Sequence, residues 1–195
     1  MEILGAIEAS GFSMWIKESS TGYVAILAFH TWALVFLVGI SGIIAVRILG
    51  VARSMPLAPT EVFFPLMWVG LLINAVTGGL LLMLYPTKYF VDLSFYIKLA
   101  CVVTAIVIIR KLQLILFHSG VDAETAAESK RVKSLATILL IVWLAATVTG
   151  RVMAYSVATK IETGIAVLVV LLVVLTIGRL IGRNLGLLDP PGQGL

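Results

Sequence analysis

Two kinds of residue are scarce in this sequence, the charged residues and cysteine. Only 12% of the 195 residues are charged and 61% are hydrophobic, whereas about a quarter of a soluble domain is charged. The mean hydropathy is +1.12. The single cysteine, Cys101, excludes an intrachain disulfide and a Cys-x-x-Cys metal or redox motif. The composition therefore excludes a water-soluble domain and predicts an integral membrane protein.

The net charge of +4 does not indicate a nucleic-acid partner. The largest basic group, Lys130, Arg131 and Lys133, directly follows an acidic stretch at 122–128 and borders a hydrophobic run. Mixed charges beside a membrane span are typical of a solvated loop. We therefore expect no nucleic-acid binding, since that needs a continuous basic surface.

Five hydrophobic runs are long enough to cross a bilayer. The predicted spans cover 22–48, 62–85, 93–117, 134–155 and 162–182, and each reaches the roughly 20 residues that a membrane helix needs. Pro56, Pro59, Pro86 and Gly120 fall between these runs, where such residues interrupt helices. The sequence predicts an all-α fold, a five-transmembrane-helix bundle over 21–183. A mobile cytoplasmic tail is expected over 184–195.

Residues 1–20 precede the first span and form a distinct segment. Apolar residues recur there at helical spacing and are expected to share one side: Ile3, Ile7, Phe12, Trp15 and Ile16. This pattern favours a short amphipathic helix at the membrane interface, with Trp15 at headgroup depth. A disordered tail is the alternative. The segment lacks a basic start before an apolar stretch, so no cleavable signal peptide is expected.

The distribution of Lys and Arg predicts the orientation. One side of the membrane holds four of them: Lys17, Lys88, Arg151 and Lys160. The other side holds nine: Arg47, Arg53, Arg110, Lys111, Lys130, Arg131, Lys133, Arg179 and Arg183. Basic loops stay in the cytoplasm, so we expect a bacterial inner-membrane protein with a periplasmic N-terminus and a cytoplasmic C-terminus.

Three ionisable residues lie inside the predicted spans. By helix rise, His30 lies roughly 12 Å below the outer boundary, Lys98 roughly 8 Å and Arg151 roughly 6 Å. Thr77 has a similar depth, beside Gly78 and Gly79, where a missing side chain leaves the backbone open. Intramembrane ionisable groups are costly and commonly functional. No Asp or Glu lies in the core of a span, so this basic layer predicts an anionic guest: a propionate, a phosphate, a quinone oxygen or a lipid headgroup.

Structural roles for the same residues remain open. Lys98 and Arg151 are shallow enough to extend to the headgroups as interface anchors. His30 is deeper, and its alternative role is a hydrogen bond to a neighbouring helix, the role that we also expect for Asn74. His118 ends the third span roughly 25 Å from His30 along the membrane normal. The two histidines therefore cannot bind one haem iron within one chain.

Three segments resemble a known group of membrane proteins. They are AFHTWALVFLVGISGIIAVRILG in the first span, TGGLLLMLYP at the end of the second and FYIKLACVV in the third. Together with the opening IEASGFSMWIKES, they make residues 1–120 similar to the bacterial superfamily of copper-resistance D proteins and membrane protoporphyrinogen IX oxidases. The resemblance implies a helical bundle that often binds haem b, with His30 and Lys98 at the working site. Little else matches the oxidases, so their reaction is not carried over.

Three functions follow as expectations. The first is a redox protein that binds haem b or a quinone and passes electrons between a periplasmic partner and the quinone pool. His30 would be an axial metal ligand or a quinone partner, Lys98 and Arg151 would hold anionic groups, and Thr77, Gly78 and Gly79 would form a wall. The second is a transporter or permease subunit for copper or a small solute. The third is a non-catalytic anchor or assembly subunit that contacts a membrane or periplasmic protein, or another copy of itself through Gly178 and Gly182 of the fifth span.

Overall fold

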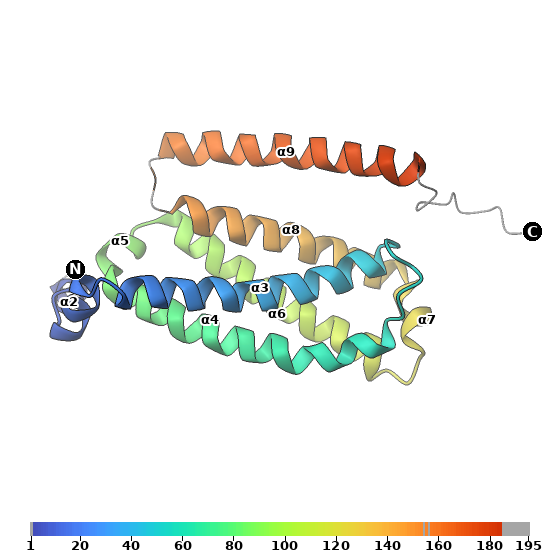
Figure 1. Cartoon of the computed structure of the whole chain (residues 1–195), viewed down its shortest axis with the longest axis horizontal. Helices are drawn as coiled ribbons and strands as arrows, with labels where there is room; N and C mark the ends of the chain where they lie inside the picture. The colour runs from blue at the N-terminus through green and yellow to red at the C-terminus, as the bar shows by residue number, and fades with distance from the viewer. Residues whose placement is uncertain (1, 154, 156, 185–195) are drawn as a thin grey trace, which may run out of the picture.

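The computed structural model describes residues 2–153, 155 and 157–184, without the side chains of 157 and 179–184. Its five long helices are α3 (Gly22–Ile48), α4 (Phe64–Leu84), α6 (Leu93–Phe117), α8 (Lys130–Val152) and α9 (Val157–Asn184) (Figure 1). Each contains a segment long and apolar enough to cross a membrane. The prediction of an all-α bundle with five spans is thereby confirmed. The predicted tail over 184–195 lies, apart from Asn184, outside the described residues.

The helix boundaries differ from the predicted ones where a helix continues into water. α8 begins at Lys130 and not at 134, because its first turn is basic and hydropathy detects only the apolar part that follows. A 3₁₀ helix, η1 (Ala58–Phe63), leads directly into α4, so that the second span is one unit from Ala58 to Leu84. The short helices α5 (Pro86–Tyr89) and α7 (Ala123–Ala127) lie in the connections that follow α4 and α6.

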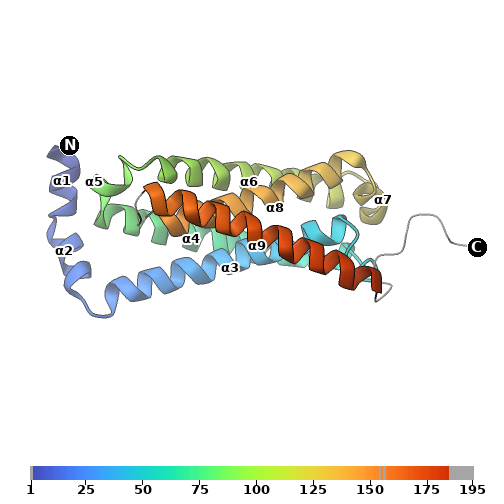
Figure 2. The same cartoon turned by 90° about the horizontal axis from the view of Figure 1, so that it is seen from above.

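The segment before α3 forms two short helices instead of the single one expected. α1 (Glu2–Glu8) and α2 (Gly11–Glu18) are separated at Ser10, whose Oγ accepts a hydrogen bond from the Ser13 amide and caps α2. The two helices lie across one end of the bundle (Figure 2), which we call the N-terminal end.

The expected single apolar side of this segment is wrong at Ile16. Ile16 is only 3% exposed and packs into the bundle, whereas Trp15 is 66% exposed and Phe12 49%. Adjacent helical residues point about 100° apart, so Trp15 and Ile16 cannot share a face. α2 therefore presents one apolar side to the bundle and another to the surroundings.

The bundle consists of two helix pairs. α3 packs along α4, α6 packs along α8, and the pairs join through α3 and α8, while α4 and α6 are barely in contact within the described residues. Ala45, Ala105 and Ala136, one each from α3, α6 and α8, are fully buried in the core, where small residues let membrane helices approach closely. The Trp143 indole of α8 donates a 3.0 Å hydrogen bond to Ser41 Oγ of α3.

Only some of the glycines in the spans mark close helix contacts. A Cβ at position 70 would lie 3.1 Å from the Ala33 carbonyl oxygen of α3. Gly39, Gly42 and Gly178, by contrast, face open space. These three glycines therefore mark no close helix contact within the described chain. The side chain position of Gly182 lies outside it.

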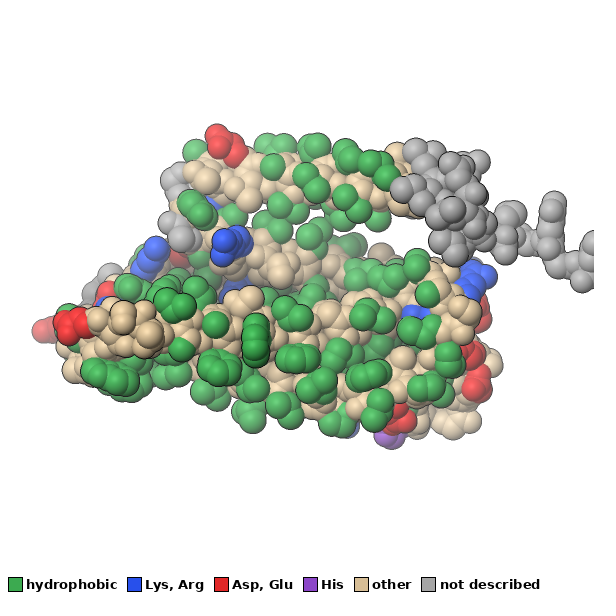
Figure 3. All heavy atoms as spheres, viewed as in Figure 1, with side chains coloured by type: hydrophobic (Ala, Val, Ile, Leu, Met, Phe, Trp, Pro, Cys, Tyr) green, Lys and Arg blue, Asp and Glu red, His purple; other side chains and the backbone are tan. Residues whose placement is uncertain are grey.

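α9 stands apart from the other four spans (Figure 1). Its apolar segment has no buried residue, and its aliphatic side chains from Ile165 to Ile177 are mostly exposed. It contacts mainly α8. Lys160 binds both carboxylate oxygens of Asp92, at 2.7 and 2.8 Å, and ties the start of α9 to the start of α6. Hydrophobic side chains cover both α9 and the bundle in Figure 3, and the acidic ones lie toward the ends.

The end opposite the N-terminal helices is held by Arg47. This side chain is 8% exposed and lies at the end of α3. It donates to the carbonyls of Met55 and Arg53, at 2.5 and 2.8 Å, and to Glu124 Oε2 at 2.8 Å. The other oxygen of Glu124 accepts from the Leu57 amide at 2.8 Å. One ion pair thus joins α3, the α3–η1 loop and α7.

Replacing Arg47 by alanine is expected to lower the free energy of unfolding by about 2 to 3 kcal/mol, because the two carbonyls and Glu124 lose their shared donor. Thermal unfolding of the detergent-solubilised protein measures the effect. Lys133→Ala, which removes the exposed pair with Glu128, is the control and should change stability by less than about 1 kcal/mol. Equal shifts for the two variants would contradict the role of Arg47.

Asp92→Asn is expected to release the start of α9 from the bundle. Burial acts to raise the pKa of Asp92, but hydrogen bonds from Lys160 and Ser94 outweigh it and hold the pKa below its usual value. The attachment is therefore complete at neutral pH and is lost only as the pH falls through this lowered pKa, below about 4.

Distances between spin labels at Ala166 of α9 and Ile141 of α8, in a Cys101→Ser background, measure this attachment. The distribution should broaden in Asp92→Asn and at acidic pH. It should stay narrow in Glu162→Gln, which changes an exposed carboxylate nearby. A distribution that is unchanged in Asp92→Asn would exclude the ion pair as the tether.

Candidate functional site

A cavity of about 320 Å³ lies between the spans toward the N-terminal end. Its lining comes from α3, α4, α6 and α8 and from the short helix α5. The polar side chains that line it are few, with His30, Asn74 and Lys98 chief among them, and most of the remainder is aliphatic or aromatic. Small-ligand sites have this character, an apolar hollow with a few placed polar groups, and begin at about this volume.

His30 faces the cavity because of its position along α3. Ala33, Leu37 and Ser41 follow it at helical spacing, and all three are buried against the other helices. Residues at this spacing share one side of a helix. The bundle-facing side of α3 therefore carries His30 at its N-terminal end, where the core gives way to the cavity.

Thr77 of α4 fixes the orientation of the His30 ring. His30 Nδ1 lies 3.0 Å from Thr77 Oγ1, and this hydroxyl lies 2.7 Å from the Ile73 carbonyl oxygen one turn earlier. Because the hydroxyl has one hydrogen, which it donates to the carbonyl, it accepts from the imidazole. This pattern assigns the proton to Nδ1 and leaves the lone pair on Nε2 directed toward the cavity.

Two further contacts hold α3 and α4 together at this level. Asn74 Nδ2 donates a 2.9 Å hydrogen bond to the His30 carbonyl oxygen, which confirms the expected interhelical bond of Asn74. A Cβ at position 78 would lie 3.2 Å from His30 Cε1. The missing side chain of Gly78 therefore provides the space that the imidazole occupies.

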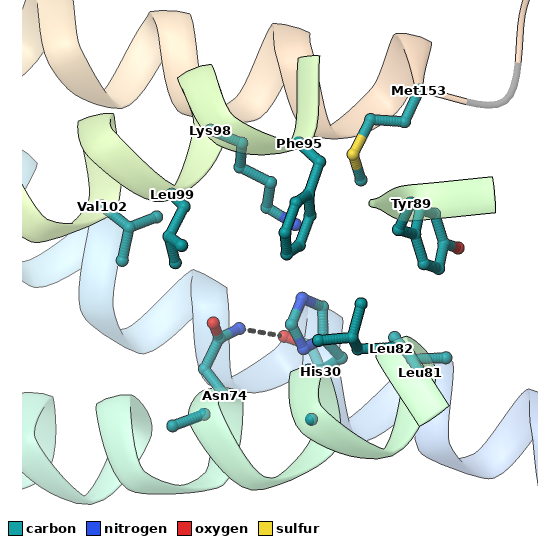
Figure 4. A pocket seen from close by; sticks show the side chains of 13 residues that line it. His30, Asn74, Leu81, Leu82, Tyr89, Phe95, Lys98, Leu99, Val102 and Met153 are labelled. Atoms are coloured by element: carbon teal, nitrogen blue, oxygen red, sulfur yellow. Dashed lines mark hydrogen bonds between the residues drawn. The ribbon is translucent and has the colours of Figure 1, made fainter. Parts of the chain in front are cut away.

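Lys98 enters the cavity from the opposite helix pair. Its stem runs past α8, where a Cβ at position 150 would lie 3.2 Å from Cε and 3.3 Å from Nζ. Gly150 thus provides for Lys98 the space that Gly78 provides for His30. The ammonium makes no hydrogen bond or ion pair within the part of the chain that the structure describes. Figure 4 shows Lys98 reaching from α6 toward the imidazole, with the ring of Phe95 beside it.

The structure brings together four of the six predicted site residues around the cavity and places a fifth behind it. His30, Lys98, Gly78 and Gly79 line the cavity, and Thr77 supports the imidazole from behind. Arg151 differs from the expectation: it is exposed and does not belong to the lining. Helix rise gives the depth of a residue along the membrane normal but not the side of the helix on which its side chain lies. The Arg151 side chain lies on a side of α8 that does not line the cavity.

Several residues of the site were not predicted from the sequence. Asn74 precedes Gly78 by one helical turn, so the shared face of α4 was a usable signal. Tyr89 and Phe95 lie beyond Pro86, and only the folded chain brings their rings to the cavity, stacked with centroids 6.2 Å apart. Met153 and Gly150 come from the end of α8. No local pattern distinguishes them from other apolar residues.

His118 is remote from this cavity. It ends α6 at the opposite end of the bundle, where its Nε2 lies 3.7 Å from Glu61 Oε1 and both side chains are about half exposed. No cluster of three or more His, Cys, Asp or Glu side chains suited to a metal ion occurs among the described residues.

The side chains around the cavity suit haem b poorly. A haem carries two propionates, and Lys98 is the one cation among the described residues of the lining. Arg151, the second expected partner, is exposed elsewhere. A smaller neutral group with oxygen atoms needs only the donors and acceptors that His30 and Lys98 supply.

Comparisons with protein-family models, with curated proteins and with solved structures gave no match to this chain.

Thr77→Val is expected to change the protonation pattern of His30. Without the hydroxyl acceptor, the tautomer with the proton on Nδ1 loses its stabilising hydrogen bond, and the other tautomer should become populated. Nitrogen NMR of histidine-labelled protein measures this directly, because the chain has only two histidines and His118→Gln leaves the two ring nitrogens of His30 to be observed. Thr77→Ser should keep the original tautomer. A spectrum of Thr77→Val identical to that of Thr77→Ser would contradict the assignment.

Proposed function

We propose that this protein is a membrane redox protein that binds a quinone head group in the cavity. One observation carries the proposal: His30 and Lys98, from different helix pairs, face the same largely apolar hollow. A quinone head group is a flat ring with an oxygen atom at each of two opposite ends. An apolar pocket with one polar partner on each side matches that distribution of polarity.

The two basic residues supply different interactions. The Lys98 ammonium can donate a hydrogen bond to one ring oxygen, in either redox state. His30 Nε2 carries a lone pair and can accept a hydrogen bond from the hydroxyl at the other end when the ring is reduced. Phe95 and Tyr89 lie along the cavity wall, where aromatic side chains can pack against a flat ring.

The proposed task is electron exchange between the quinone pool and a periplasmic protein. Oxidation of a quinol releases two electrons and two protons. His30 Nε2 can accept the proton from the hydroxyl that it faces, and the second proton passes to water at the membrane surface. A one-electron carrier in the periplasm would take the electrons one at a time. This direction follows from the predicted orientation, in which the N-terminal end is periplasmic.

Copper transport is less well supported by the same residues. A copper ion would find His30 and the Met153 thioether beside the cavity, and both are suitable ligands for Cu(I). The Lys98 ammonium in the same hollow would repel a cation, however. A role as an anchor subunit rests on α9, whose apolar surface is unburied within the described residues, and requires no ligand in the cavity.

Binding of a decyl-substituted benzoquinone and of its quinol to the purified protein tests the proposal. Lys98→Met should weaken binding of both forms about tenfold or more, and His30→Ala should weaken binding of the quinol by a similar factor, because an oxygen or hydroxyl of the ring loses its partner. Lys88→Met and His118→Ala, which change the same residue types outside the cavity, should leave the affinity within about threefold. Equal affinities in all four variants, or no binding to the wild type, would exclude a quinone site here.

An absorption spectrum of the purified protein distinguishes the alternatives in the same sample. A Soret band that disappears in His30→Ala would show that the ligand of the cavity is haem b and not a quinone. Copper bound in an amount that depends on His30 and Met153 would favour transport.

A further inference from the structure

The cavity has an opening on its side, between α4 and α6. These two helices flank the cavity but belong to different pairs and have few close backbone approaches along the described chain. Their ring contact, Phe64 with Phe117, lies at the opposite end of the bundle. Ala75 and Gly79 of α4 and Leu99 of α6 line the cavity and are exposed, Leu99 at 50%. Because these exposed lining residues come from both helices, they mark an opening between α4 and α6, which we call the α4–α6 portal.

The portal faces lipid and not water. Its rim is apolar: Val76 of α4 and Val103 of α6, beside the portal residues, are exposed by 56% and 53%. Both helices are membrane spans at this level. Ala75 and Gly79 are one helical turn apart on the same side of α4, so this side of α4 carries no bulky side chain at the opening.

The N-terminal end of the cavity, in contrast, is covered by aromatic residues. Tyr89 of α5 stacks on Phe95 of α6 there. α5 is held in place by α1 and α2: Thr87 donates a hydrogen bond to Glu8, and the Lys17 ammonium lies 4.7 Å from the centre of the Tyr85 ring. The more open path from the cavity therefore leads sideways.

We infer that the ligand of this cavity is a lipid-soluble molecule with a long apolar chain, and that the chain passes through the α4–α6 portal into the bilayer. The inference rests on the proposed function and specifies its substrate class. A head group between His30 and Lys98 leaves no enclosed space for a chain of many carbons in a hollow of about 320 Å³. The portal lets the chain remain among lipid acyl chains while the head group binds.

Glycine 79 allows a direct test. A Cβ at this position would meet nothing within 4 Å, so a larger side chain can be introduced without displacing the helices. Gly79→Phe, or the smaller Gly79→Leu, would occupy the path of the chain. Gly39 of α3 provides a matched control, because it also faces open space and does not line the cavity.

Two ligands are compared in protein reconstituted into lipid nanodiscs: the decyl-substituted benzoquinone, and the same ring with a methyl group in place of the decyl chain. Gly79→Phe and Gly79→Leu should weaken binding of the decyl form about tenfold more than binding of the methyl form. Gly39→Phe should change neither by more than about threefold. Size-exclusion profiles verify that each variant is folded.

A decyl benzoquinone with a photoreactive diazirine in its chain supplies a second measurement. Crosslinks on α4 and α6 around the portal support the inference, and crosslinks confined to α1, α2 and α5 overturn it. Equal losses for both ligands in the Gly79 variants, or a loss in Gly39→Phe as large as in Gly79→Phe, also overturn it while the proposed function stands. If neither quinone binds the wild type, the proposed function itself fails.

Discussion

The structure depends on one constraint, the absence of water in the bilayer interior. A polar group placed there must find its partner on another helix or be matched by a ligand. Asn74, Thr77, Ser41 and Trp143 satisfy this condition through hydrogen bonds that they form across or along the helices. His30 satisfies it at one ring nitrogen. Its other nitrogen and the Lys98 ammonium are directed into the cavity. These two polar groups can be matched by a ligand, and the proposed function rests on that.

The arrangement of the helices as two pairs determines where polar side chains can face a cavity. α3 packs closely against α4 through Gly70, and α6 packs along α8. The buried residues of α6 all lie from Ala105 onward, so the bundle is less tightly packed toward the N-terminal end, where Gly78 and Gly150 leave room for one basic side chain each. The pocket and its inferred opening between α4 and α6 both lie at this end.

Polar attachments concentrate at the two ends of the bundle, where water is available. Arg47 and Glu124 fasten the loops at one end, and Lys160 with Asp92 fastens α9 at the other. α9 has few further contacts with the bundle. In lipid this costs little, because acyl chains solvate an aliphatic helix as well as another helix does. The core of the fold is thus the four-helix bundle of α3, α4, α6 and α8, which also holds most of the residues around the cavity.

The sequence by itself determined the class of the protein and its five spans. These follow from hydropathy, which is a local property along the chain. It also identified His30, Lys98, Thr77 and Gly78, because ionisable groups and glycines stand out in apolar helices. Only the tertiary structure decided the directions of side chains: Arg151 is exposed, Ile16 faces the bundle, Tyr89 and Met153 line the cavity, and Gly150 lies beside Lys98. The direction of a side chain depends on helix rotation and on its neighbours, which packing between distant segments sets.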